Sequence, residues 1–174
     1  YGVISKINMD VNSRLKTQAG IDWRTATIEH AREVRDLLGG DYFVYTGNDN
    51  DKTPASQMKG LGDIVAYHNN TTVDWIGAYY QGNYVSGPIN AYGMVGQSSI
   101  AYSYQDMFTE AQKKVTSNPI ATSQIKGGIM YDLSESIAVF GNYGIVEKPP
   151  ILDNVIYYDG TVSSKPMNEK FKSM

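Results

Sequence analysis

The chain has 174 residues, a length that usually corresponds to one domain and allows a substantial core. It carries 15 basic and 18 acidic residues, and the resulting charge of −3 and pI near 5.3 exclude the basic face typical of nucleic-acid-binding proteins. The 41% hydrophobic content excludes an ordinary disordered chain, and the lack of cysteine excludes disulfides and thiolate metal sites.

The first two elements are alternating segments joined by a short turn. Residues 1–11 and 15–26 each alternate apolar and polar side chains, which is the pattern of a strand with one apolar face. Asn12, Ser13 and Arg14 lie between them, so the two segments predict a β-hairpin. The 14 tyrosines and 17 glycines of the chain also favour strands and turns over a helical bundle.

A long connection follows, from residue 27 to residue 70, and it far exceeds ordinary connection lengths. Loops of this length usually carry function. One short helix is predicted inside it, because Thr27 can cap its start and the pair Gly39 and Gly40 can end it. The apolar residues at helical spacing are Ala31, Val34 and Leu38.

Four more strands are predicted after this connection. A turn at Gly87 joins the first and second, a polar loop separates the second from the third, and a turn at Ser134 joins the third and fourth. A final long loop follows the fourth. The strands are 71–84, 89–104, 124–133 and 137–143, and the two loops are 105–123 and 145–170. Short and long connections therefore alternate strictly along the chain.

This rhythm favours an all-β, antiparallel up-and-down transmembrane β-barrel, with short turns on one rim and long extracellular loops on the other. A β-sandwich normally mixes connection lengths. No apolar run reaches the roughly 18 residues of a membrane helix, but membrane strands alternate and need only about 9–11 residues. Aromatic girdles mark the interfaces of such barrels, so Trp23 and Trp75 are assigned to the outward apolar band or its girdle.

Several stretches carry a family resemblance. Residues 20–47, 72–84 and 124–161 resemble the barrel of TonB-dependent outer-membrane receptors, and most closely the type with a carboxypeptidase-regulatory-like N-terminal extension. The segment Asn-Glu-Lys-Phe at 168–171 follows a Phe-x-Asn-x-Gly strand and a Pro-rich loop. It is similar to the entry into the next strand in that family.

The resemblance implies a barrel of about 22 strands closed by a plug domain, which imports a scarce nutrient such as a siderophore or glycan. The implied location is the outer membrane of a Gram-negative bacterium, and the implied partners are outer-membrane lipid, the plug domain, the TonB complex and a small-molecule or oligosaccharide ligand. The chain begins with Tyr1 and has no recognisable plug, TonB box or C-terminal aromatic strand. Residues 1–174 are therefore expected to be an internal part of about six to seven strands. The charged residues expected to face the lumen are Lys16, Asp22, Arg24 and Lys126.

A soluble, secreted β-sandwich that binds carbohydrate is the alternative. In a sandwich the apolar faces pack against a second sheet, whereas in a barrel they face lipid. The side chains whose burial separates the two are Ile21, Trp23, Val73 and Trp75.

The last long loop contains candidate ligand contacts. Asp153, Tyr157, Tyr158 and Asp159 offer aromatic platforms and acceptors suited to a sugar or another polar ligand. The same aromatic residues would equally serve to pack the loop on itself.

Two weaker patterns concern metals. Glu29, His30 and Glu33 would share one face of the predicted helix and could hold a divalent ion, but a solvated helix face explains them more simply. The oxygen-rich run that includes Asp49 and Asp51 lacks the spacing and distal Glu of a calcium loop, so a polar turn is expected. No metal site, cofactor or enzymatic activity is predicted, because a nucleophile elbow, a phosphate-binding Gly loop and an acid pair are missing from the sequence.

Overall fold

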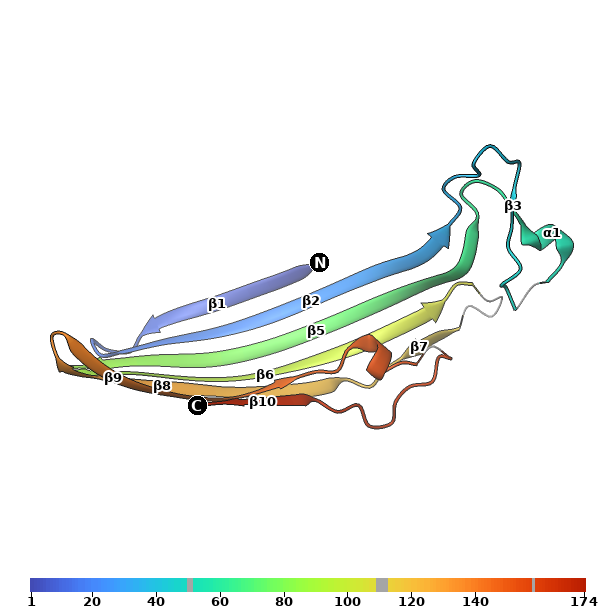
Figure 1. The fold of residues 1–174 in the computed structure, drawn as a ribbon. Coiled ribbons are helices and arrows are strands. Elements are labelled where there is room, and N and C mark those ends of the chain that lie inside the picture. The colour runs from blue at the N-terminus through green and yellow to red at the C-terminus, as the bar shows by residue number, and fades with distance from the viewer. Residues whose placement is uncertain (50–51, 109–112, 158) are drawn as a thin grey trace.

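The computed structural model describes residues 1–49, 52–108, 113–157 and 159–174, and its main feature is one long, curved antiparallel sheet (Figure 1). Its strands follow the order β1-β2-β5-β6-β8-β9-β10, and each is antiparallel to its neighbours. This confirms the all-β prediction. The strands are β1 (Gly2–Asp10), β2 (Leu15–Glu33), β5 (Ile64–Ser86), β6 (Ile89–Asp106), β8 (Ile120–Ser134), β9 (Ile137–Lys148) and β10 (Glu169–Ser173).

Smaller elements lie in the connections. A short strand in the β6–β8 connection pairs with β6, and a separate two-stranded sheet and two short helices lie in the other long connections. These elements are β7 (Lys114–Thr116), β3 (Phe43–Val44), β4 (Met58–Lys59), the α-helix α1 (Pro54–Gln57) and the 3₁₀ helix η1 (Leu152–Asn154).

The connections sort by length onto the two ends of the sheet, as the sequence predicts. Three short turns, at 11–14, 87–88 and 135–136, lie at one end, and the three long connections lie at the other (Figure 1). In the first turn the Asn12 carboxamide oxygen accepts from the backbone N–H groups of Arg14 and Leu15, both at 2.9 Å. In the second, Gly87 has φ of 56°, the left-handed conformation that a glycine adopts without strain.

The helix expected between residues 27 and 38 is wrong. This segment is the second half of β2, which continues to Glu33 and pairs with β5, for example Thr27 with Thr72. The ladder satisfies the backbone groups that a helix would have bonded internally, so tertiary pairing overrides the local spacing of apolar residues. The helix of this connection is instead α1, whose start is capped by the Thr53 side chain accepting from the Ser56 N–H.

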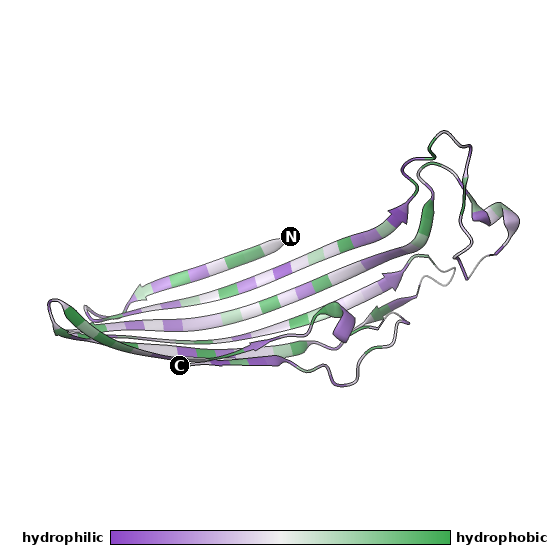
Figure 2. Ribbon diagram, in the orientation of Figure 1, coloured by the Kyte–Doolittle hydropathy of each residue, from purple (hydrophilic) through white to green (hydrophobic). Residues whose placement is uncertain are grey.

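The two faces of the sheet differ in chemistry, and Figure 2 shows the alternation along the strands. Residues directly opposite each other in a ladder share a face, so the registers define one face that contains Trp23 and its partner Ile76. We call its apolar residues the apolar band. They are Val3, Ile7, Met9, Leu15, Ala19, Ile21, Trp23, Ile76, Ala78, Tyr80, Tyr84, Ile89, Ala91, Val95, Ile125, Ile129, Tyr131, Val139, Tyr143 and Ile145.

The apolar band occupies about seven to nine residues of each strand, counted from the short-turn end, and then stops. Beyond it the same face carries polar residues such as Thr25, Asp74 and Glu147. Within the band of β1, β2, β5, β6, β8 and β9, this face has no charged side chain among the described residues. In β10, Lys170 and Lys172 lie on the same face at the loop-side boundary of the band, and Lys170 pairs with Glu147 at 3.0 Å.

The opposite side, which we call the polar face, carries the charges of these strand segments. Lys16, Asp22, Arg24 and Lys126 all lie on it, as predicted for residues that share one side of the sheet. Trp75 also lies on the polar face, because its ladder partner is Arg24. Its assignment to the same outward band as Trp23 is therefore wrong.

Burial agrees with this division. Ile21 and Trp23 are 59% and 45% exposed, whereas Val73 and Trp75 are only partly exposed and pack against a buried cluster on the polar face. That cluster contains no second sheet: it joins strand residues to the connection between β9 and β10. A barrel was expected to expose Ile21, Trp23, Val73 and Trp75 alike, and a sandwich was expected to pack them against a second sheet. Neither expectation describes all four residues.

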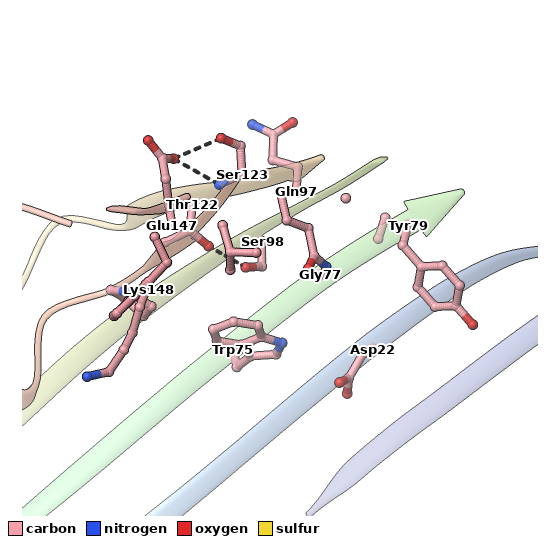
Figure 3. Close-up of a pocket in the computed structure, with 16 residues that line it drawn as sticks. Asp22, Trp75, Gly77, Tyr79, Gln97, Ser98, Thr122, Ser123, Glu147 and Lys148 are labelled. Atoms are coloured by element: carbon pink, nitrogen blue, oxygen red, sulfur yellow. Dashed lines mark hydrogen bonds between the residues drawn. The ribbon is translucent and has the colours of Figure 1, made fainter. Parts of the chain in front are cut away.

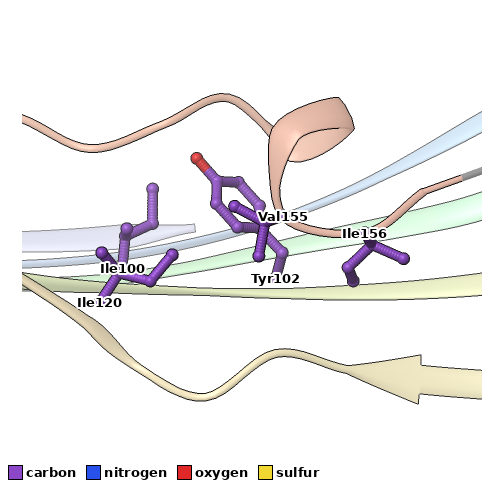
Figure 4. Packing of buried hydrophobic residues seen from close by; sticks show 5 residues of the cluster. All are labelled: Ile100, Tyr102, Ile120, Val155 and Ile156. Atoms are coloured by element: carbon purple, nitrogen blue, oxygen red, sulfur yellow. The ribbon is translucent and has the colours of Figure 1, made fainter. Parts of the chain in front are cut away.

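The connection at 149–168, which we call the strap, contributes two residues to the buried cluster, Val155 and Ile156 (Figure 4). Val155 is fully buried, and Ile156 is 4% exposed. The Tyr102 hydroxyl donates to the Pro150 carbonyl oxygen at 2.9 Å and fixes the start of the strap. The strap is thereby held against the loop end of the polar face by side chains on β6 and β8, which are Ile100, Tyr102 and Ile120.

The sheet is open along β1 and β10 in the part of the chain that the structure describes, so these strands do not form a closed barrel. The strand predicted at the Asn-Glu-Lys-Phe segment is confirmed as β10. Within the described ranges, the structure contains no helix of sufficient length and apolarity to span a membrane.

One close approach on the polar face gives a stability prediction. Gly20 lies under the ring of Tyr79, and a Cβ added at Gly20 would lie 2.6 Å from Tyr79 Cζ. The hydroxyl of this ring donates to the Gln18 side-chain oxygen at 2.7 Å. We expect Gly20→Ala to displace the ring from that hydrogen bond and to lower the free energy of unfolding by about 1–3 kcal/mol. Urea titration of the protein in detergent measures the change.

The matched control is Gly93→Ala, because a Cβ there meets no atom within 4 Å. Combining Gly20→Ala with Tyr79→Ala should cost less than the sum of the two single changes, since no ring remains to be displaced. Equal effects at Gly20 and Gly93 would contradict the close contact.

Candidate functional site

A hollow of about 490 Å³ lies on the polar face, beside the strap (Figure 3). Its lining comes from six strands that are neighbours in the sheet, β2, β5, β6, β8, β9 and β10. Side chains of six consecutive strands can border one hollow only where the sheet curves around it, so the hollow lies on the inside of the curve. This volume is within the range of about 300–1,000 Å³ that is usual for small-molecule sites.

Three aromatic residues border the hollow: Trp75, Tyr79 and Phe171. Trp75 also packs against the buried cluster under the strap, which holds the indole in place. The Tyr79 hydroxyl donates to the Gln18 side-chain oxygen at 2.7 Å, which fixes the second ring. The aromatic rings therefore come from β5 and β10, on either side of the intervening strands β6, β8 and β9.

Small residues form the floor between these rings. A Cβ added at Gly77 would lie 3.2 Å from Ser98 Cβ and 3.4 Å from Trp75 Nε1. At Gly96 it would lie 2.9 Å from Gln124 Nε2. The absence of a side chain at these two glycines thus lets the Trp75 indole and the Gln124 carboxamide lie close against the strand backbone.

The polar groups around the hollow are largely paired with one another. Asp22 receives two hydrogen bonds from the Arg24 guanidinium, at 2.8 and 2.6 Å. Lys148 Nζ lies 3.2 Å from a carboxylate oxygen of Glu169, and the hydroxyls of Ser98 and Thr122 are 2.6 Å apart. Each charge at the hollow therefore has a counter-charge, and the site has little net charge of its own.

Two further polar groups are available at the hollow. Among the described residues, neither the indole N–H of Trp75 nor the carboxamide of Gln124 has a hydrogen-bond partner. A donor and a carboxamide beside an aromatic ring are the groups that orient a polar ligand in a pocket.

Those ligand contacts predicted in the strap that the structure describes, Asp153, Tyr157 and Asp159, do not border this hollow. Asp153 lies in η1, and Tyr157 is 49% exposed. Asp159 accepts a hydrogen bond from the Thr161 N–H at 2.8 Å, and this bond holds the pKa of its carboxyl below the usual value. Tyr158 lies outside the described residues. The role of these four residues in ligand contact stays a prediction.

The candidate metal ligands are not brought together. In a strand, Glu29 and Glu33 lie on the face opposite to His30, so the shared helical face does not exist. Glu29 instead bonds His68 Nε2 at 2.6 Å. Within the described ranges, no group of three potential ligands could hold a metal ion.

The oxygen-rich run near residue 49 is only partly described. Asp49 pairs with Lys52 at 2.9 Å, whereas Asn50 and Asp51 lie outside the described residues.

No protein-family model, curated protein or solved structure matches this chain.

Proposed function

We propose that this chain forms part of the barrel wall of a TonB-dependent outer-membrane receptor, which imports a scarce nutrient such as a siderophore or glycan. The observation that carries the proposal is the apolar band, an uncharged apolar surface that the described residues leave uncovered. Large apolar surfaces without cover mark a contact with a partner or a membrane.

The dimensions of the band support lipid over a protein partner. The seven to nine residues of each strand, at roughly 3.3 Å each and tilted by about 40°, span about 18–23 Å, which approaches the apolar belt of about 25 Å in outer-membrane barrels. Tyr84 and Tyr131 lie near its turn-side edge and Trp23 near its loop-side edge, where aromatic girdles occur. The turns and long loops at opposite ends fit the two sides of an outer membrane.

The family assignment rests on the resemblance of the sequence together with this band. The receptor would then use outer-membrane lipid, a plug domain and the TonB complex as partners, and the polar face would line the interior. The secreted β-sandwich has less support, because the band has no second sheet against it among the described residues. The separate β3–β4 sheet has only two residues in each strand.

Cysteine labelling in intact cells tests the proposal. Ser13 and Ser164 are both exposed, one in the first short turn and one in the strap, and cysteine is nearly isosteric with serine. In the full-length protein, we expect a membrane-impermeant maleimide to label Ser164→Cys in intact cells and Ser13→Cys only after lysis. The protein should also leave the envelope fraction only with detergent.

Labelling of both variants in the culture medium would instead support a secreted protein and reject the receptor. Labelling of Ser13→Cys alone in intact cells would contradict the proposed orientation.

A further inference from the structure

We propose that the hollow on the polar face is a binding site for a neutral carbohydrate, with Trp75 as its stacking platform. The inference rests on the proposed function in placing this face inside a receptor that binds a ligand. It adds the site and the chemical class of the ligand.

The aromatic residues are the first reason. A pyranose ring exposes a flat face of C–H groups, and a fixed aromatic ring offers the matching apolar surface. Trp75 is held from the side of the strap by the buried cluster, so little side-chain freedom remains to be lost on binding. The bare glycine at position 77 lets the indole lie close against the floor of the hollow, where a Cβ would approach Nε1 to 3.4 Å.

The paired charges are the second reason, and they separate neutral from charged ligands. An anionic ligand needs an unpaired cation, but the Arg24 guanidinium is bonded to Asp22 and Lys148 is bonded to Glu169. A cationic ligand would need one of those carboxylates. Hydroxyl groups, in contrast, can bond to paired carboxylates, to the Gln124 carboxamide and to the Ser98–Thr122 pair without displacing an ion pair.

The experiment uses the full-length protein purified in detergent and isothermal titration with a series of oligosaccharides. The neutral probes are maltoheptaose, cellohexaose, xylohexaose and mannohexaose, and oligogalacturonate is the anionic probe. We expect at least one neutral probe to bind and oligogalacturonate to bind more weakly. Trp75→Ala should weaken that binding at least tenfold, and Trp75→Phe, which keeps an aromatic platform, should retain most of it.

Two further variants test whether the effect is specific to the hollow. Trp23→Ala removes the other tryptophan of this chain, from the opposite face, and should bind as the unmodified protein does. Ser98→Phe keeps Trp75 but fills the hollow and should abolish binding. Heat-modifiable migration in gels confirms that each variant is folded.

Three results would overturn the inference: no neutral probe binds, Trp75→Ala binds as well as Trp23→Ala, or oligogalacturonate binds best. These failures are distinguishable from failure of the proposed function, because the labelling of Ser13→Cys and Ser164→Cys reports the membrane location without any ligand.

Discussion

Tyr80→Arg should lower the free energy of unfolding in phospholipid vesicles by about 2–4 kcal/mol, whereas the neighbouring Gln81→Arg should change it by less than about 0.5 kcal/mol. Tyr80 lies in the middle of the apolar band on β5, and its ladder partners are Ala19 and Val95. An arginine there would face hydrocarbon. Gln81 is one residue further along the strand and lies on the polar face, opposite Gln18.

The two substitutions lie on the same strand, at nearly the same distance from the short turn, and introduce the same residue. A difference between their effects on the free energy of unfolding therefore reports which face of the sheet contacts lipid. Urea titration in vesicles measures the stability, and heat-modifiable migration in gels reports assembly. Small and equal effects would indicate that both faces contact water, which is the behaviour of a soluble sheet, and would reject the lipid-facing band.

Val155→Asp should release the strap while leaving the sheet intact. Val155 has no exposed surface, and it packs against Ile100 and Tyr102 under the strap. A carboxylate at this position has no partner, and burying it costs several kcal/mol, which is more than local detachment costs. With a shift of about 3 kcal/mol the strap should open roughly 100-fold more often, so thermolysin should cleave correspondingly faster before Val162, which packs against the buried cluster when the strap is docked.

The control for this prediction is Ile151→Asp, four residues earlier in the same strap. Ile151 is 57% exposed, so its substitution should change cleavage less than about threefold. Global unfolding in urea should be unchanged for both variants, because the strap contributes no strand to the ladder between β6 and β8. Loss of the whole sheet in Val155→Asp would show that the strap is required for the fold, contrary to this prediction.

The local pattern of the sequence was sufficient for the strand order and for the sorting of turns and loops onto two ends. Alternation has a period of two and is visible within one segment, and turn residues such as Asn12 and Gly87 act locally. The local pattern did not predict the conformation of residues 27–33, where apolar residues at helical spacing lie in a strand. The pairing with β5, more than 30 residues away, decides that conformation.

The candidate site was harder to predict for the same reason. Alternation along residues 71–84 places Trp75 and Ile76 on opposite faces, but both faces of this segment contain apolar residues. Only the register with β2 shows that Ile76 accompanies Trp23 and that Trp75 accompanies Arg24. The loop residues proposed from their chemistry, Asp153 and Tyr157, lie away from the hollow, because the strap buries Val155 and Ile156 instead.

By itself, the sequence determined an acidic, cysteine-free, all-β chain in which Lys16, Asp22, Arg24 and Lys126 share one side of the sheet and short and long connections alternate. The tertiary structure decided which tryptophan belongs to which face, how far β2 and β5 extend, and that side chains from six strands enclose one hollow. Alternation is a property of a single strand, whereas faces, registers and hollows depend on which strands become neighbours.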